Sequence, residues 1–150
     1  MGACLLDRRD NTALVFGAHV GHELVLEWRR DNPGKRQFVT EAELLPQLIA
    51  KVNWRSRIAG SKIITFIDSN PAKYALIKGT SESTSCEDIV RACSLEDAKY
   101  VTWNWFTRVP TKSNVADGPS RLVFPAKIGT FRTEKCEVIQ PKSLSAGAWT

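Results

Sequence analysis

Three carboxylates stand where the sequence predicts a strand to end or a helix to begin. Glu43 falls in the first turn of a predicted helix, Asp68 follows the apolar run KIITFI, and Asp117 lies in the segment VADGPSR. In an open α/β sheet, ligands bind outside the carboxyl ends of the strands. Carboxylates that gather there repel one another unless a cation lies between them, and hard oxygen ligands favour Mg²⁺. Two such ions about 4 Å apart can hold a phosphodiester, activate water and stabilise the leaving oxygen.

Each of these carboxylates also has a purely structural interpretation. Glu43 completes the pattern Thr-Glu-Ala-Glu that starts at Thr40, and this pattern is typical of a capping box. Asp68 could be a turn residue, although Asn70 before a proline already provides an N-cap for the next helix. Asp117 precedes a Gly-Pro pair, which is a common turn sequence. Taken one at a time, the three residues therefore leave both interpretations open.

The spacing of apolar residues predicts alternating strands and helices around these positions. Pro46 fits the helix that holds Glu43 only in its first turn, so we expect that helix to begin nearer Glu43 than Thr40, or to be kinked. Residues 24–36 are a mixed stretch that ends in a turn signal. The predicted elements are a hairpin (3–8 and 13–20), a helix from about residue 43, a buried strand (62–67), helices over 70–79 and 87–98, an aromatic strand (100–109) and a weak strand candidate (136–139).

This order predicts an α/β domain with a mixed sheet. Within it, Trp103 and Trp105 alternate along the aromatic strand and share one of its faces. Such a pair is more often part of a hydrophobic core than a platform for stacking bases. We therefore expect both tryptophans to be buried.

The composition is that of an ordinary globular chain of 150 residues, with 43% hydrophobic residues and a formal net charge of +5. Its longest apolar stretches are far shorter than a bilayer span, so we expect no membrane association. The modest positive charge is compatible with a polyanion such as nucleic acid but does not require one. Four cysteines without metal-finger spacing predict reduced thiols and an intracellular location, in the cytoplasm or nucleus.

Three segments together resemble the ribonuclease H domain of retroelement (retrotransposon) reverse-transcriptase polyproteins. Glu43-Leu44-Leu45-Pro46 matches a helical Glu motif, and Glu41 is a possible substitute for Glu43. Asp68-Ser69 matches the end of a buried strand, and VPTKSNVADGPSR matches the segment that carries the last Asp. The similarity defines a ribonuclease H-like domain over residues 1–124 and leaves a C-terminal tail over residues 125–150.

The resemblance implies a mixed sheet flanked by helices and a two-metal endonuclease that cuts the RNA strand of RNA–DNA hybrids. Its cofactor would be Mg²⁺, with Mn²⁺ as a possible replacement, bound by Glu43, Asp68 and Asp117 as catalytic and metal-ligating residues. Its partners would be the hybrid or another nucleic acid and a reverse-transcriptase polymerase domain. The residues expected to contact nucleic acid are Ser69, Asn70, Lys73, Lys112, Asn114 and Arg121.

The chain departs from the family at its start. The family opens with a central strand that bears the first catalytic Asp, whereas this chain begins at what corresponds to the hairpin that follows. Asp7 and Asp10 lie across the hairpin turn and are poor substitutes. The alternatives to an active nuclease are therefore a catalytically dead domain that binds nucleic acid or has a structural role, and an element remnant without a selected function.

A missing central strand has a structural consequence, because unpaired buried backbone groups cost about 1–3 kcal/mol each. We expect the isolated chain either to close its sheet with another segment or to fold poorly. The candidates for closing the sheet are the ACLL segment near the N-terminus and residues 136–139.

Overall fold

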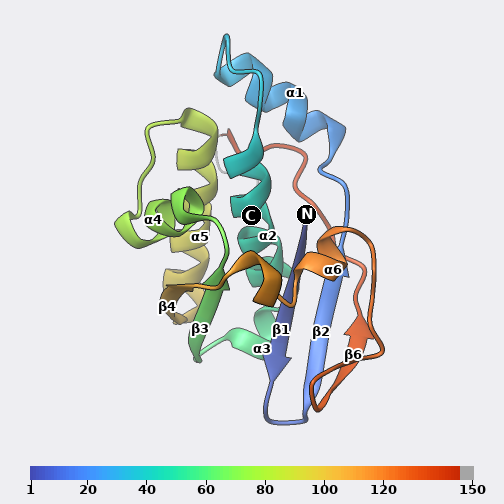
Figure 1. The fold of residues 1–150 in the computed structure, drawn as a ribbon. Helices are drawn as coiled ribbons and strands as arrows, with labels where there is room; N and C mark the ends of the chain where they lie inside the picture. The colour runs from blue at the N-terminus through green and yellow to red at the C-terminus, as the bar shows by residue number, and fades with distance from the viewer. Residues whose placement is uncertain (146–150) are drawn as a thin grey trace.

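The strands of this chain form two separate sheets, flanked by helices (Figure 1). The computed structural model describes residues 1–145. The larger sheet is mixed, in the order β1-β2-β6-β5, with β1 antiparallel and β6 parallel to β2. The smaller sheet is the parallel pair β3-β4. The strands are β1 (Gly2–Asp7), β2 (Thr12–Gly17), β3 (Lys62–Ile67), β4 (Trp103–Arg108), β5 (Lys127–Ile128) and β6 (Phe131–Lys135).

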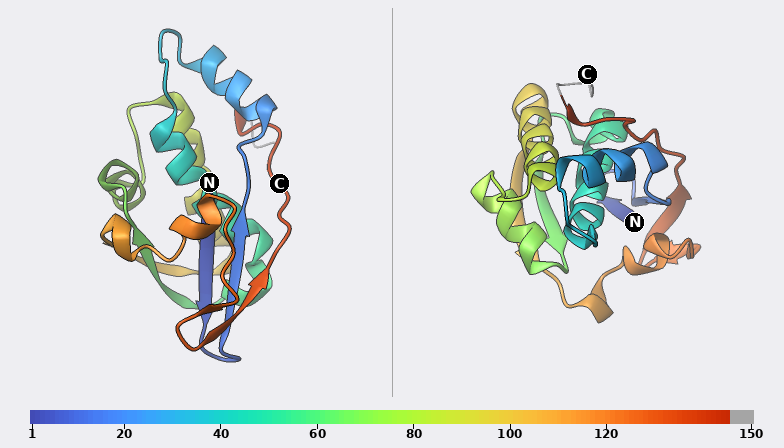
Figure 2. Two further views of the ribbon diagram at one scale, coloured as in Figure 1. Left: turned by 45° about the vertical axis from the view of Figure 1, so that its right-hand side comes forward. Right: turned by 90° about the horizontal axis from the view of Figure 1, so that it is seen from above.

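The helices lie mainly on one side of the strands (Figures 1 and 2). The fold therefore combines helices with a mixed sheet and belongs to the α/β class. They are α1 (His22–Asp31), α2 (Val39–Asn53), α3 (Arg55–Ile58), α4 (Asn70–Lys78), α5 (Thr84–Tyr100), the short 3₁₀ turn η1 (Thr111–Ser113) and α6 (Asp117–Ser120). Helix α2 contacts β1, α4 and α5, and therefore lies between the two sheets and the outer helices.

The core is organised around one apolar face of α2. Leu44, Leu45, Leu48 and Ile49 recur at the spacing that places side chains on one side of a helix, and all four are fully buried. They belong to a single hydrophobic cluster that includes residues of the hairpin, of β3 and of α5. Burial of each such side chain contributes about 1.5–3 kcal/mol to the stability of the folded state. The contacts of these four residues are therefore a major part of what holds the two sheets together.

Several helix boundaries differ from the sequence-based expectations. Helix α2 begins at Val39 and contains Pro46 in its interior, so the expected start near Glu43 is wrong. Pro46 is buried within α2, at a position where its ring lacks the N–H that a residue inside a helix donates. The expected capping box is absent, because Phe38 is the N-cap residue and no side chain caps this helix.

Two further local predictions need correction. Ser69, not Asn70, caps α4, because its side chain accepts a hydrogen bond from the Ala72 N–H at 3.3 Å. The stretch after the hairpin is helix α1, which was not predicted because no capping side chain marks its start. By contrast, the expected end of α4 at Gly79 is confirmed, with that residue in the left-handed conformation.

The C-terminal tail joins the larger sheet. Strand β6 pairs with β2, so the strand lies at 131–135 and not at the expected 136–139. Beyond it, the Asn53 side chain exchanges hydrogen bonds with the backbone of Ile139, and Leu144 is buried in the core. The tail therefore runs along the side of the hairpin that is remote from β3 (Figure 1).

No described strand lies between β1 and β3. These two strands are not hydrogen-bonded neighbours in either sheet. The ACLL segment remains in β1 as part of the hairpin, and the tail extends the opposite edge. The first alternative, that one of these segments closes the sheet, is therefore wrong, and poor folding of the isolated chain stays a prediction. The space between β1 and β3 is called the strand gap below.

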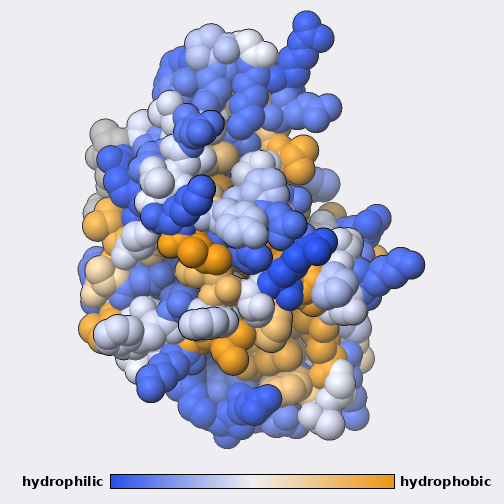
Figure 3. All heavy atoms as spheres, turned by 60° about the vertical axis from the view of Figure 1, so that its left-hand side comes forward, coloured by the Kyte–Doolittle hydropathy of each residue, from blue (hydrophilic) through white to orange (hydrophobic). Residues whose placement is uncertain are grey.

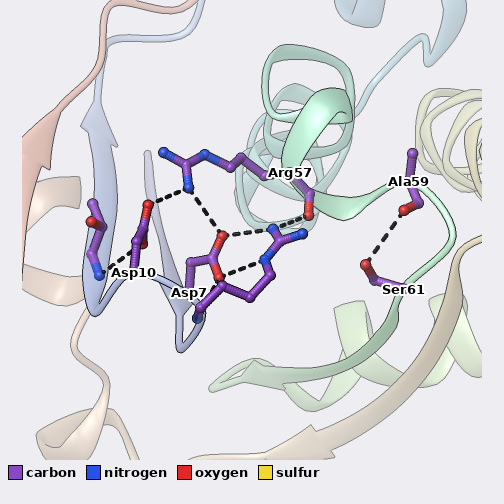
Figure 4. A network of polar contacts seen from close by, with 7 residues as sticks. Asp7, Asp10, Arg57, Ala59 and Ser61 are labelled. Atoms are coloured by element: carbon purple, nitrogen blue, oxygen red, sulfur yellow. Dashed lines mark hydrogen bonds and ion pairs between the residues drawn. The ribbon is translucent and has the colours of Figure 1, made fainter.

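Ionic contacts connect the two sides of the strand gap at one end. The Asp7 carboxylate, at the end of β1, is paired with Arg9 at 2.6 Å and with Arg57 at 3.2 Å (Figure 4). Arg57 also pairs with Asp10 at 2.5 Å. Because Arg57 belongs to α3, which leads directly into β3, these contacts fix the start of β3 relative to the end of β1.

At the other end, α6 is seated against the hairpin through two glycines. Gly2 and Gly17 are directly opposite each other in the β1-β2 pair. A Cβ atom on Gly17 would lie 1.8 Å from the Pro119 carbonyl oxygen, and one on Gly2 would lie 2.5 Å from the Ser120 nitrogen. Only glycine at both positions allows the backbone of α6 to approach the strands this closely.

We predict that Gly17→Ala destabilises the protein by about 2–3 kcal/mol, because the new methyl group collides with backbone and forces α6 away from the hairpin. Urea unfolding would measure the loss. The control is Gly21→Ala, whose Cβ would meet only the Gln140 side chain at 3.7 Å. Equal stability of the two variants would contradict the proposed seating of α6.

A second prediction concerns acid stability. Hydrogen bonds from Arg9 lower the pKa of Asp7 well below its ordinary range, although burial acts in the opposite direction. The folded state therefore binds a proton at Asp7 less readily than the unfolded state, and the stabilisation is present at neutral pH and lost as the pH falls below about 4.

We expect Asp7→Asn to lower the free energy of unfolding at neutral pH by about 2 kcal/mol and to flatten its decline with acid. Asp10→Asn is the comparison variant, because Asp10 is exposed, pairs with Arg57 and accepts the Thr12 N–H, and we expect it to have the smaller effect. Urea unfolding at a series of acidic pH values would test this prediction. It would be refuted if the free energy of unfolding of Asp7→Asn fell with acid as steeply as that of the unaltered protein.

Candidate functional site

Asp68 lies directly after β3, at the carboxyl end of the smaller sheet. Its carboxylate is half-buried, and its Oδ2 atom accepts a hydrogen bond from Asn114 Nδ2 at 3.0 Å. Ser69 caps the next helix, and the backbone therefore turns sharply away after Asp68. As a result, the Asp68 carboxylate lies at an edge that other segments can approach.

Asp117 is held near this edge by the segment that connects β4 to α6. This segment crosses the carboxyl end of β3 (Figure 1). The Asn114 carbonyl accepts the Asp117 N–H at 3.1 Å, and the Asn114 side chain accepts the Ala116 N–H at 3.0 Å. Asn114 therefore contacts Asp68 through its side chain and Asp117 through its backbone, and the two sequence-predicted residues share it as a neighbour.

Asp117 also has a cationic partner on the next turn of chain. Its carboxylate pairs with Arg121 at 3.2 Å, and both side chains are exposed enough to exchange this contact for others. An exposed ion pair of this kind contributes about 0–1 kcal/mol to stability. Arg121 therefore neutralises Asp117 without fixing it.

The two glutamates of the first predicted motif have different surroundings. Glu41 is fully buried and accepts hydrogen bonds from Lys35, Ser83 and Ser85. Burial acts to raise the pKa of Glu41, but the hydrogen bonds from Lys35 and Ser85 outweigh it, so the pKa lies below its ordinary value. Glu41 connects α2 to the start of α5 and is not accessible to a ligand.

Glu43 is half-buried on α2, and no hydrogen bond or ion pair holds its carboxylate within residues 1–145. It is two residues from Glu41 and therefore points to a different side of the helix. Of the two glutamates, Glu43 is the one that remains available for binding.

Oxygen donors at Asp68 and Asp117 suit a hydrated Mg²⁺, which usually keeps several waters and needs only one or two carboxylates. Glu43, Asp68 and Asp117 do not form a closed group, because within the described part of the chain only one set of three acidic, His or Cys side chains has ligand atoms within 4.8 Å of one another. The convergence of all three on a pair of metal ions stays a prediction.

That one set is Glu27, Asp31 and Asp88, at the junction of α1 and α5, and it could hold a metal ion. Burial raises the pKa of Asp88, and the negative charges of Glu27 and Asp31 raise it further. The positive charge of Arg91 acts in the opposite direction. The three carboxylates also have protein partners: Arg30 pairs with Asp31, Arg91 pairs with Asp88, and Glu27 accepts two backbone N–H groups of the tail. Sequence reasoning missed this group, whose one local signal is the four-residue spacing of Glu27 and Asp31.

The remaining predicted contact residues are distributed around the Asp68 edge. Asn70 and Lys73 lie in the first turn of α4, directly after Asp68, and the Lys73 amine lies over the Tyr74 ring at 4.6 Å. Lys112 is exposed in η1, two residues before Asn114. Their placement leaves both lysine amines near the solvent side of this edge.

Trp103 and Trp105 are not part of the core, so the sequence-based expectation is wrong. Their exposed fractions are 66% and 72%. Together with Ile64 and Phe66, they lie on the face of the smaller sheet that is opposite to the helices. The space-filling view shows apolar side chains at the surface on this side of the molecule (Figure 3). We call these four residues the outer apolar face.

Comparisons with known proteins identify no relative: no family model matches the chain, and no curated protein or solved structure matches it significantly. Within residues 1–145, none of the helices has the length and apolar character that a bilayer crossing requires. All four cysteines are free thiols. The site is therefore interpreted from its own residues.

We predict that Glu41→Gln lowers stability by about 2 kcal/mol, because the buried amide loses charge-assisted hydrogen bonds. Glu43→Gln, the matched control two residues away, is expected to change stability by less than about 0.5 kcal/mol. Thermal unfolding of both variants would test the assignment, and a larger loss in Glu43→Gln would reverse the roles given to the two glutamates.

Proposed function

We propose that this chain is a ribonuclease H-like nucleic-acid-processing domain, and that the edge formed by Asp68 and Asp117 is its Mg²⁺-dependent site for the RNA strand of an RNA–DNA hybrid. The observation that supports this most is the position of Asn114, which contacts both Asp68 and the Asp117 backbone. Asn114 thereby connects the residue after β3 to a segment far along the chain, at the carboxyl end of a parallel strand pair, where α/β sheets bind ligands.

The residues of this edge have the chemistry that such a substrate requires. Asp68 and Asp117 would hold Mg²⁺, and Glu43 is the further carboxylate expected to reach it. A bound Mg²⁺ would polarise the phosphodiester and activate water for attack. Asn114 would keep Asp68 oriented, since its amide occupies one carboxylate oxygen and leaves the other for a cation.

Cationic side chains around the edge would bind the phosphate backbone. Lys73, Lys112 and Arg121 are near Asp68 or Asp117 in the chain, and Arg121 could exchange its ion pair with Asp117 for a phosphate when a cation binds that carboxylate. Ser69 and Asn70, at the start of α4, would lie beside the strand that is held. Because these contacts replace counterions on the nucleic acid, binding would weaken as salt increases.

A second candidate function is binding of the hybrid without cleavage. The ion pair of Asp117 with Arg121 favours it, because the protein itself supplies a cation at that carboxylate. The absence of a closed group formed by Glu43, Asp68 and Asp117 within residues 1–145 favours it as well. The same surface would then recognise the nucleic acid and perform no chemistry.

The test measures binding and cleavage of one labelled RNA–DNA hybrid with Mg²⁺ and with EDTA. We expect Mg²⁺-dependent binding that weakens with salt, and about a tenfold loss of affinity in Asp68→Asn. Asp31→Asn is the control, because it removes a carboxylate from the other acidic group and leaves the Asp68 edge intact.

Each outcome distinguishes the candidates. Cleavage that Asp68→Asn abolishes supports the nuclease, whereas Mg²⁺-dependent binding without cleavage supports the second candidate. Hybrid affinity that does not change with salt concentration would contradict both candidate functions. Binding that is lost in Asp31→Asn and kept in Asp68→Asn would contradict them as well.

A further inference from the structure

The strand gap has an unpaired backbone edge on its β1 side. Met1 and Ala18 exchange both of their backbone hydrogen bonds, so they are a hydrogen-bonded pair. Hydrogen-bonded and non-hydrogen-bonded residue pairs then alternate along the antiparallel β1-β2 pair. The N–H and C=O groups of Gly2, Cys4 and Leu6 therefore point away from β2 and into the gap. Within residues 1–145, no strand pairs with this edge.

The β3 side of the strand gap also has unpaired backbone N–H and C=O groups. The Trp103 N–H donates to the Ser61 carbonyl and the Val109 N–H donates to the Ile67 carbonyl, so alternate residues of β3 face β4. The backbone groups of the residues between them, Ile64 and Phe66, point to the gap. This edge also has no strand partner among the described residues.

The two edges lie side by side, and among residues 1–145 no strand pairs with either of them. β1 and β3 lie next to each other with opposite directions in both ribbon views (Figures 1 and 2). Natural edge strands are usually blocked by charges, prolines or bulges. Here the residues with gap-facing backbone are mostly apolar or small, and Lys62 at the start of β3 is the one charged residue among them.

Side chains beside the gap are exposed and apolar. Leu6 is 41% exposed on β1, and Ile64 and Phe66 of the outer apolar face are exposed on β3. An inserted strand with apolar side chains on its outer face would cover these residues. Nucleic acid would not satisfy two ladders of alternating N–H and C=O groups, whereas an extended peptide would satisfy both.

We propose that the strand gap binds an extended segment of a partner protein, five or six residues long and apolar at alternate positions, as a strand between β1 and β3. The segment runs parallel to one of these strands and antiparallel to the other, because β1 and β3 have opposite directions. Its length matches the six-residue strands on either side. Binding joins the two sheets into one.

Both ends of the strand gap are held in place before a partner strand binds. The Asp7–Arg57 contacts hold one end, and the Asn114–Asp68 contact with the seated α6 holds the other. A partner strand therefore meets two edges that are already ordered, which lowers the entropy cost of association. The proposal does not depend on the proposed function, because it requires neither a metal ion nor nucleic acid.

The experiment selects binders from a displayed library of random eight-residue peptides and then measures amide hydrogen exchange with the best synthetic peptide. We expect enriched sequences with alternating apolar residues. In the complex, the amides of Cys4, Leu6, Ile64 and Phe66 should exchange at least tenfold more slowly. The amides of neighbouring residues, which already face β2 or β4, should change little.

Two controls separate strand addition from hydrophobic adhesion. Ile64→Lys should weaken peptide binding at least tenfold, whereas Leu95→Lys on α5 should leave it unchanged, and both native side chains are 64% exposed, so neither change disturbs the core. The same peptide with N-methyl groups at alternate residues should also lose affinity, because it lacks the donors for one ladder.

The contrary results are equally definite. Failure to enrich any peptide, equal binding to Ile64→Lys, or absence of the alternating protection would overturn the proposal. Concentration-dependent dimers of the free protein with the same four amides protected would show that a second copy occupies the gap. Single-stranded RNA that protects these amides would assign the surface to nucleic acid.

Discussion

Packing on α2 is the interaction on which the rest of this structure depends. No strand hydrogen bond joins the two sheets within the described residues, so the shared core must hold them in place. Leu44, Leu45, Leu48 and Ile49 supply that core from one face of a single helix. Hydrophobic contact is strong but not directional, and the relative position of the sheets therefore requires specific polar contacts as well.

Those polar contacts lie at the two ends of the strand gap, and each has a consequence for the site. The Asp7–Arg57 pair sets where β3 starts, and β3, about 20 Å long, determines where Asp68 stands. This arrangement also places Asp7 at the end of β3 remote from Asp68. At the far end, Gly2 and Gly17 admit α6, and Asn114 connects its Asp117 to Asp68.

Much of the fold could be predicted because it follows from local patterns. The hairpin, the KIITFI strand, the helix that ends at Gly79 and the aromatic strand all lie close to their expected positions. The errors concern features that local patterns do not encode. Pro46 lies inside α2 and is buried there, and α1 forms without a side-chain cap because Leu24 and Trp28 are buried in the core.

For the candidate site, the sequence by itself determined the residue types and their order: a carboxylate after a buried strand, and another after an Asn in the last loop. Only the tertiary structure decided that Asn114 joins Asp68 to Asp117, that Glu41 is buried while Glu43 is not, and that Glu27, Asp31 and Asp88 meet. It also decided that Trp103 and Trp105 face outward. The physical reason is that alternation along a strand specifies two faces, and which of them is covered depends on elements elsewhere in the chain.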